Sequence, residues 1–168
     1  MVLWGLVVII LVAVAWQDFK YRAVDTWMFP LAVALVILQS VMLHTFSWTS
    51  VGINLLIIAL QLTLLNLLMY WQRKEWLMAG ERWMGWGDVA FFGVLACCFS
   101  PVNFVVFYVF SLLFILIASL AVAIAGYKVG RIPLAGGQAA LLAAIWLCDY
   151  SYRGQRLYMD IDLMRFIQ

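Results

Sequence analysis

The stretch Gly85-Trp86-Gly87-Asp88 places a carboxylate directly after two glycines, where an apolar run over residues 89–100 begins. A second isolated acid, Asp18, ends the first apolar run of the chain. A charged side chain at the centre of a membrane-spanning helix costs roughly 2.5–3.5 kcal/mol on insertion scales. Acids in so apolar a sequence are therefore candidates for function, and a pair of them suggests acid–base chemistry.

The composition around these acids is that of a membrane protein. The chain has 168 residues, of which 68% are hydrophobic and 11% are charged, whereas soluble domains carry about 25% charged residues. A spanning helix needs about 20 apolar residues, and the fourth of six apolar runs is clearly shorter than that. The runs lie at 1–17, 27–43, 51–71, 89–100, 102–125 and 132–148. We predict an all-α polytopic membrane protein with about six transmembrane helices, forming one membrane-embedded domain over residues 1–168.

Lysine and arginine are distributed unevenly between the connections. Seven of them follow the first, third and fifth runs, whereas the two opposite connections, 44–50 and 100–103, contain none. The positive-inside rule then predicts that the basic connections are cytoplasmic and that the amino terminus faces outward. Three arginines in the tail after residue 148 conflict with this orientation. Asp18 and Asp88 are thus expected at the same, cytoplasmic edge of the bilayer.

Few other side chains offer catalytic or metal-binding chemistry. His44 is the single histidine, and the same charge count places it on the side opposite the two aspartates. Ser–His and Cys–His catalysis are therefore disfavoured. Cys97, Cys98 and Cys148 fall inside predicted spans without a CxxC spacing. We expect buried thiols there, and neither a metal site nor a cofactor.

Each aspartate also has a purely structural explanation. Gly87 can form a turn from which Asp88 caps the next helix, and Asp18 can be a solvated acid beside Lys20 and Arg22. Two aspartates brought close together would instead share one proton, because neighbouring like charges do not both ionise easily. One carboxylate could then activate a water while the other protonates or polarises a carbonyl. Such a pair can hydrolyse an amide without a metal or a covalent intermediate.

Three segments resemble the type IV prepilin peptidases. Gly85-Trp86-Gly87-Asp88 matches the GxGD motif of membrane-embedded aspartic proteases. Asp18-Phe19-Lys20-Tyr21-Arg22-Ala23-Val24 resembles the first-aspartate motif of that family, and Arg131-Ile132-Pro133-Leu134 resembles the Ile-Pro segment that opens its last helix. The resemblance extends over nearly the whole chain in helix number, topology and order of motifs.

This resemblance implies a membrane aspartic endopeptidase in the cytoplasmic (inner) membrane. Asp18 and Asp88 would be the catalytic residues, and Gly85 and Gly87 would support them through the backbone. The expected partners are the lipid bilayer and prepilin-like or pseudopilin-like membrane proteins, whose short basic leader would be cleaved at the cytoplasmic membrane edge. No nucleic-acid partner and no methyltransferase activity are expected, as in the short peptidase-only members such as the preflagellin peptidases.

Two positions depart from the family pattern. Ala90 stands where lysine is common, and Asp25-Thr26 follow Val24 where the first motif commonly continues as Ile-Pro-Asn. We expect Asp25 to be a solvated loop acid rather than a catalytic one.

Two alternatives remain open. A GxGD intramembrane protease of the presenilin type would have a Tyr-Asp pair where this chain has Gln17-Asp18. A non-catalytic protein, such as a transporter subunit or an assembly factor, would use the two acids to bind a cation or a basic peptide.

Overall fold

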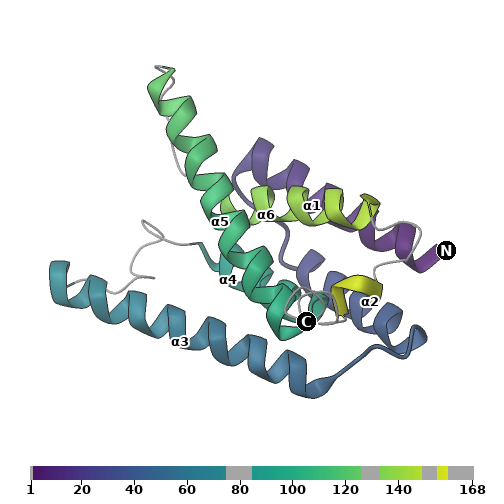
Figure 1. Cartoon of the computed structure of the whole chain (residues 1–168). Coiled ribbons are helices and arrows are strands. Elements are labelled where there is room, and N and C mark those ends of the chain that lie inside the picture. Colours follow the sequence, from purple (N-terminus) through teal and green to yellow (C-terminus); the bar gives the residue numbers. More distant parts are fainter. Residues whose placement is uncertain (1, 75–84, 126–132, 149–154, 159–168) are drawn as a thin grey trace, which may run out of the picture.

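The computed structural model describes residues 2–74, 85–125, 133–148 and 155–158 (Figure 1). These residues form six α-helices and one short 3-10 helix. In chain order they are α1 (Val2–Tyr21), α2 (Met28–Met42), α3 (Trp48–Arg73), α4 (Trp86–Cys98), α5 (Pro101–Ile124), α6 (Leu134–Cys148) and η3 (Gln155–Tyr158). No strand occurs in this part of the chain, so the prediction of an all-α polytopic fold is confirmed.

The helices fall into a long and a short set. α1, α3 and α5 have 20, 26 and 24 residues and are apolar and long enough to cross a membrane. α2, α4 and α6 have 15, 13 and 15 residues, which span about 20–23 Å at 1.5 Å per residue. A hydrocarbon core is about 30 Å thick. The sequence predicted a short helix only for the fourth run, but α2 and α6 are also too short to cross the core. α6 begins only after Pro133, and α2 ends at Met42.

Helix α4 lies at the centre of the bundle and contacts α2, α3, α5 and α6 (Figure 1). Its apolar side chains are buried from Phe91 onward, apart from the position of Gly93. The Asn54 amide of α3 donates hydrogen bonds of 3.0 and 2.9 Å to the carbonyls of Ala96 and Phe99. Carbonyls at the end of a helix have no partner within it, so this buried asparagine attaches α3 to the end of α4.

Two further contacts define the ends of the bundle. α1 and α6 pack along each other in the most extensive helix–helix contact of the fold (Figure 1). At the end of α6 where the tail begins, η3 docks on the turn between α4 and α5. The Ser100 N–H and the Asn103 amide donate to the Leu157 carbonyl at 2.9 and 3.2 Å. The starts of α4 and α6 and the end of α1 meet at the opposite end of the bundle.

Several features predicted from the sequence lie outside the described residues. These are most of the connection after α3 (75–84), the basic residues Lys128 and Arg131, and the tail residues Arg153 and Arg165.

Candidate active site

The side chains of Asp18 and Asp88 meet at the first turn of α6. The Gly136 N–H donates to Asp18 Oδ2, and the Ala135 N–H donates to Asp88 Oδ1 at 3.0 Å. Ala135 and Gly136 are consecutive residues, and consecutive Cα atoms are about 3.8 Å apart. The structure therefore brings together two acids that are 70 positions apart in the sequence, and it does so through the backbone of a third segment.

The amino terminus of α6 explains why it binds carboxylates. The first N–H groups of a helix have no partner within the helix, and a serine, threonine, asparagine or aspartate just before the helix usually accepts from the second or third of them. Pro133 occupies that position here and has no side-chain acceptor. Ala135 and Gly136 are the second and third residues of α6, and the carboxylates of α4 and α1 take the place of the missing cap.

Asp18 projects from the last turn of α1. The sequence places it at the end of an apolar run that leads into a loop, but the helix continues to Tyr21. Asp18 is only 8% exposed, which corrects the reading of this residue as a solvated acid. Arg22 follows directly after the helix and its charge attracts the Asp18 carboxylate.

Asp88 projects from the first turn of α4. The helix begins at Trp86, so Gly87 is helical rather than part of a turn. Asp88 is the third helical residue, and its Oδ2 accepts a 3.3 Å hydrogen bond from the Gly85 N–H. Asp88 thus caps the start of its own helix through Oδ2 and the start of α6 through Oδ1. The negative charges of Asp88 and Asp18 repel each other.

The two motif glycines are not required by strain or crowding in this arrangement. Gly85 has an extended backbone with φ −82°. A Cβ at Gly85 would lie 3.5 Å from Asp88 Oδ2, and one at Gly87 would lie 3.7 Å from Phe29 Cζ, both ordinary contacts. The polar contact of this motif with Asp88 comes from the Gly85 N–H.

Asp25, the third acid near this end of the bundle, does not bind α6. It is exposed, and Gln17 forms a two-point contact with it. The Gln17 amide donates to Asp25 Oδ2 at 3.0 Å, and the Asp25 N–H donates to Gln17 Oε1 at 3.1 Å. Asp25 is thus an exposed loop acid, as expected, and its bonds to the residue that precedes Asp18 hold the connection after α1 against the helix.

Other candidate groups lie apart from the two carboxylates. His44 lies just after the end of α2, whereas Asp18 lies near the connection that leads into the start of α2. His44 and Asp18 are therefore at opposite ends of α2. Cys97 and Cys98 are buried as expected, but Cys148 is exposed, so the prediction of three buried thiols is wrong for that residue. No group of three His, Cys, Asp or Glu side chains suited to a metal occurs among the described residues.

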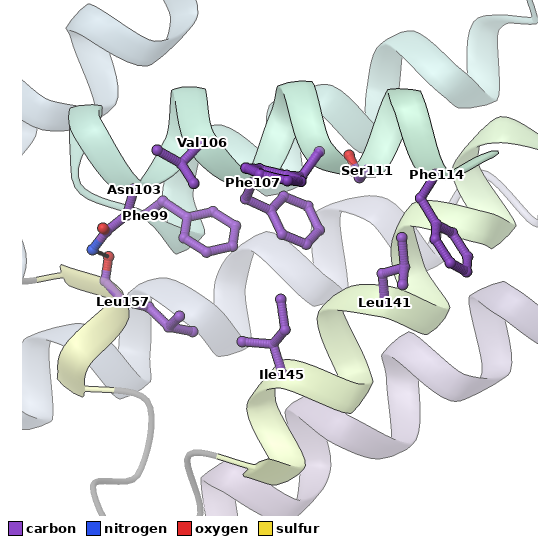
Figure 2. Close-up of a pocket in the computed structure, with 10 residues that line it drawn as sticks. Phe99, Asn103, Val106, Phe107, Ser111, Phe114, Leu141, Ile145 and Leu157 are labelled. Carbon is purple, nitrogen blue, oxygen red and sulfur yellow. Dashed lines mark hydrogen bonds between the residues drawn. The ribbon is translucent and has the colours of Figure 1, made fainter. Parts of the chain in front are cut away.

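An apolar groove lies elsewhere, between α5 and α6 (Figure 2). It has a volume of about 520 Å³ and is lined mainly by phenyl rings and aliphatic side chains such as Phe107, Leu141 and Ile145. Toward the start of α6 the Gln138 amide donates to Ser111 Oγ at 3.1 Å, one turn from the carboxylates. The groove contains no acid or base, so the carboxylate pair defines the candidate active site.

Sequence reasoning identified both acids but missed the segment that joins them. Ala135 and Gly136 contribute only backbone N–H groups, which no side-chain pattern reveals. A signal was present, because Pro133 opens the last apolar run without a capping side chain before it. An uncapped helix start inside an apolar bundle needs acceptors from elsewhere.

Comparison with known proteins assigns the chain to a family. No curated protein and no solved structure matches the chain. Residues 5–127 match the type IV leader peptidase family. That range contains both aspartates and ends before α6. Because the match covers more than half of the chain, this protein belongs to the type IV leader peptidase family.

Proposed function

We propose that this protein is an aspartic endopeptidase of the inner membrane that removes the leader from prepilin-like or pseudopilin-like membrane proteins. Asp18 and Asp88 are its catalytic pair, and Gly85 supports Asp88 through the backbone. Membership of a leader peptidase family supports proteolysis. The observation that carries the assignment of the residues is the binding of both carboxylates to consecutive amides at the start of α6.

In the proposed reaction the pair holds one proton, because two adjacent carboxylates do not both ionise easily. The ionised carboxylate removes a proton from a water, whose oxygen attacks the carbonyl carbon of the leader peptide bond. The protonated carboxyl donates its proton to the carbonyl oxygen. The carboxyl that took the proton from water then gives it to the leaving nitrogen, while the other carboxylate takes a proton from a hydroxyl of the tetrahedral intermediate. The C–N bond breaks, the nitrogen becomes the new amino terminus of the substrate, and the pair again holds one proton.

The surroundings of the two acids differ in a way that assigns the roles. Asp88 lies in the first turns of two helices, in its own helix and against α6, and it accepts two backbone N–H groups. Helix amino termini and N–H donors stabilise negative charge. Asp18 shares the start of α6 with Asp88, but only one backbone N–H binds it, and it lies in the last turn of α1, where the dipole of that helix disfavours negative charge. The positive charge of Arg22 also stabilises the ionised form of Asp18 and so opposes this difference between the two acids. Arg22 is exposed, however, and its charge is screened by water. In this proposal Asp88 is the base and Asp18 carries the proton.

The position of the pair at one end of the bundle suits cleavage at a membrane edge. Both acids lie within one turn of a helix end. A leader bond just before an apolar substrate helix would be presented at this level. The uneven distribution of lysine and arginine supports the cytoplasmic face. A transporter would more often place its acids near the middle of the membrane. A presenilin-type protease would place a Tyr-Asp pair and GxGD within long helices, whereas Gln17 precedes Asp18 here and both acids lie near helix ends. Both alternatives are therefore less favoured.

Co-expression with a panel of epitope-tagged prepilins tests this function. The wild-type chain is expected to shorten a substrate by the length of its leader, whereas Asp88→Asn leaves the substrate at full length. Asp25→Asn is the matched control, since it removes a nearby acid that does not touch α6. If no prepilin is shortened by wild-type protein present in the membrane, the non-catalytic alternative replaces this proposal.

A further inference from the structure

A second feature of the site concerns Gly136, which is buried in the first turn of α6 against Asp18. A Cβ added to Gly136 would lie 2.8 Å from Asp18 Cβ, 2.8 Å from Asp18 Oδ2 and 3.2 Å from Asp18 Cγ. Carbon atoms in contact lie about 3.5–4.0 Å apart. The overlap with Asp18 Cβ matters most, because a Cβ is fixed to its helix and rotation of the side chain cannot move it away.

We propose that Gly136 is a positioning residue for the aspartate pair: its missing Cβ lets the start of α6 reach Asp18, so that consecutive amides hold both carboxylates in one place. With any larger residue, α1 and α6 must separate by roughly 0.7 Å or more to restore an ordinary contact. The Gly136 N–H would then leave Asp18, while the Ala135 N–H could remain with Asp88. The distance between the two acids would change without the loss of either acid. The catalytic part of this inference rests on the function proposed above.

The adjacent glycine provides a matched steric control. A Cβ at Gly137 would also meet atoms at 2.8 Å, but these are Cδ1 and Cγ1 of Ile115 on α5. The two glycines therefore have equally close neighbours on two different helices, Asp18 on α1 and Ile115 on α5, and only one of those neighbours is an aspartate. Gly93 in α4 has nothing within 4 Å of an added Cβ and serves as the open-space control.

The first experiment measures kcat and KM for leader cleavage by purified protein. Gly136→Ala is expected to lower kcat about 100-fold, since a misplacement near 1 Å can cost that much, with KM nearly unchanged. Gly93→Ala is expected to retain wild-type values. Wild-type kcat in Gly136→Ala, or an effect confined to KM, would overturn the proposal.

The second experiment needs no activity and uses thermal unfolding in detergent. Helix propensity favours alanine over glycine, so a lower Tm in Gly136→Ala reports the collision. In an Asp18→Gly background the colliding atoms are absent, and the same substitution is expected to cause no fall in Tm. Whatever change in Tm Gly137→Ala causes is expected to be the same in both backgrounds, because its neighbour is Ile115 rather than Asp18.

An equal fall for Gly136→Ala in both backgrounds would overturn the proposed contact. If Gly136→Ala alone does not fold, recovery of folded protein in the double variant supports the proposal, and failure to recover contradicts it. A wild-type chain without peptidase activity would overturn the proposed function, whereas this unfolding cycle still decides whether Gly136 serves the contact with Asp18.

Discussion

Replacing Asn54 with leucine should destabilise the fold by about 1–3 kcal/mol. The Asn54 side chain is fully buried and donates to the Ala96 and Phe99 carbonyls at 3.0 and 2.9 Å. Hydrogen bonds between membrane helices contribute about 0.6 kcal/mol on average and up to about 1.7 kcal/mol. The loss of two such bonds therefore lowers the free energy of unfolding by about 1–3 kcal/mol. Leucine has similar size but leaves both carbonyls without a donor. Asn54 Oδ1 has no hydrogen-bond partner among the described residues, so its removal moves the expected cost toward the lower end.

Equilibrium unfolding in mixed detergent micelles, followed by circular dichroism, measures this cost. Thr63→Val is the matched control on the same helix, because the exposed Thr63 hydroxyl donates only within α3, to the Ala59 carbonyl at 2.7 Å. That control should change the free energy of unfolding by less than about 0.5 kcal/mol. A cost for Asn54→Leu no larger than that of Thr63→Val would refute the conclusion that Asn54 attaches α3 to α4.

Three further predictions concern the carboxylates, the orientation and the connection after α1. Site-assigned ¹³C NMR of the carboxyl carbons, at the pH of activity, should show Asp18 protonated and Asp88 ionised; the opposite pattern would contradict the proposed roles. In a Cys148→Ser background, Thr45→Cys should react with an impermeant thiol reagent added outside, and Ala23→Cys only after permeabilisation; reversed labelling would refute the orientation. Gln17→Ala should cost less than about 1 kcal/mol in unfolding free energy, because its bonds to Asp25 are exposed; a larger cost would show that this pair supports the core.

The sequence was sufficient for the helices but not for the contacts between them. Apolar runs follow from composition, so six helices and the position of Asp88 near the start of α4 could be predicted. The continuation of α1 past Asp18 to Tyr21 could not, because Phe19, Lys20 and Tyr21 tolerate a helix as well as a loop. The helix bounds of α2 and α6 depend on caps and on proline, which apolar runs do not mark closely.

The candidate site shows the same division between side chains and backbone. Asp18 and Asp88 stand out because carboxylates are rare in an apolar chain. Ala135 and Gly136 do not, since their contribution is the direction of two N–H groups and the space left by a missing Cβ. These properties arise only when α1, α4 and α6 pack together. Asp25 stands out in the sequence as much as the other two acids, yet its side chain binds Gln17 instead of α6.

The most direct test of the central claim is the rate of leader cleavage by purified Asp18→Asn and Asp88→Asn variants. Asparagine keeps one acceptor oxygen, so Asp18→Asn should keep its single contact with α6 and unfold within a few degrees of wild type. Asp88→Asn keeps an acceptor for the Ala135 N–H and loses the one for the Gly85 N–H, so it should stay folded with a somewhat lower Tm. Asparagine cannot exchange the proton that hydrolysis requires, so each variant should lose cleavage, while Asp25→Asn cleaves at nearly the wild-type rate. Cleavage by either folded single variant at a rate close to that of wild type would contradict the account, and the two aspartates would then serve only as caps for α6.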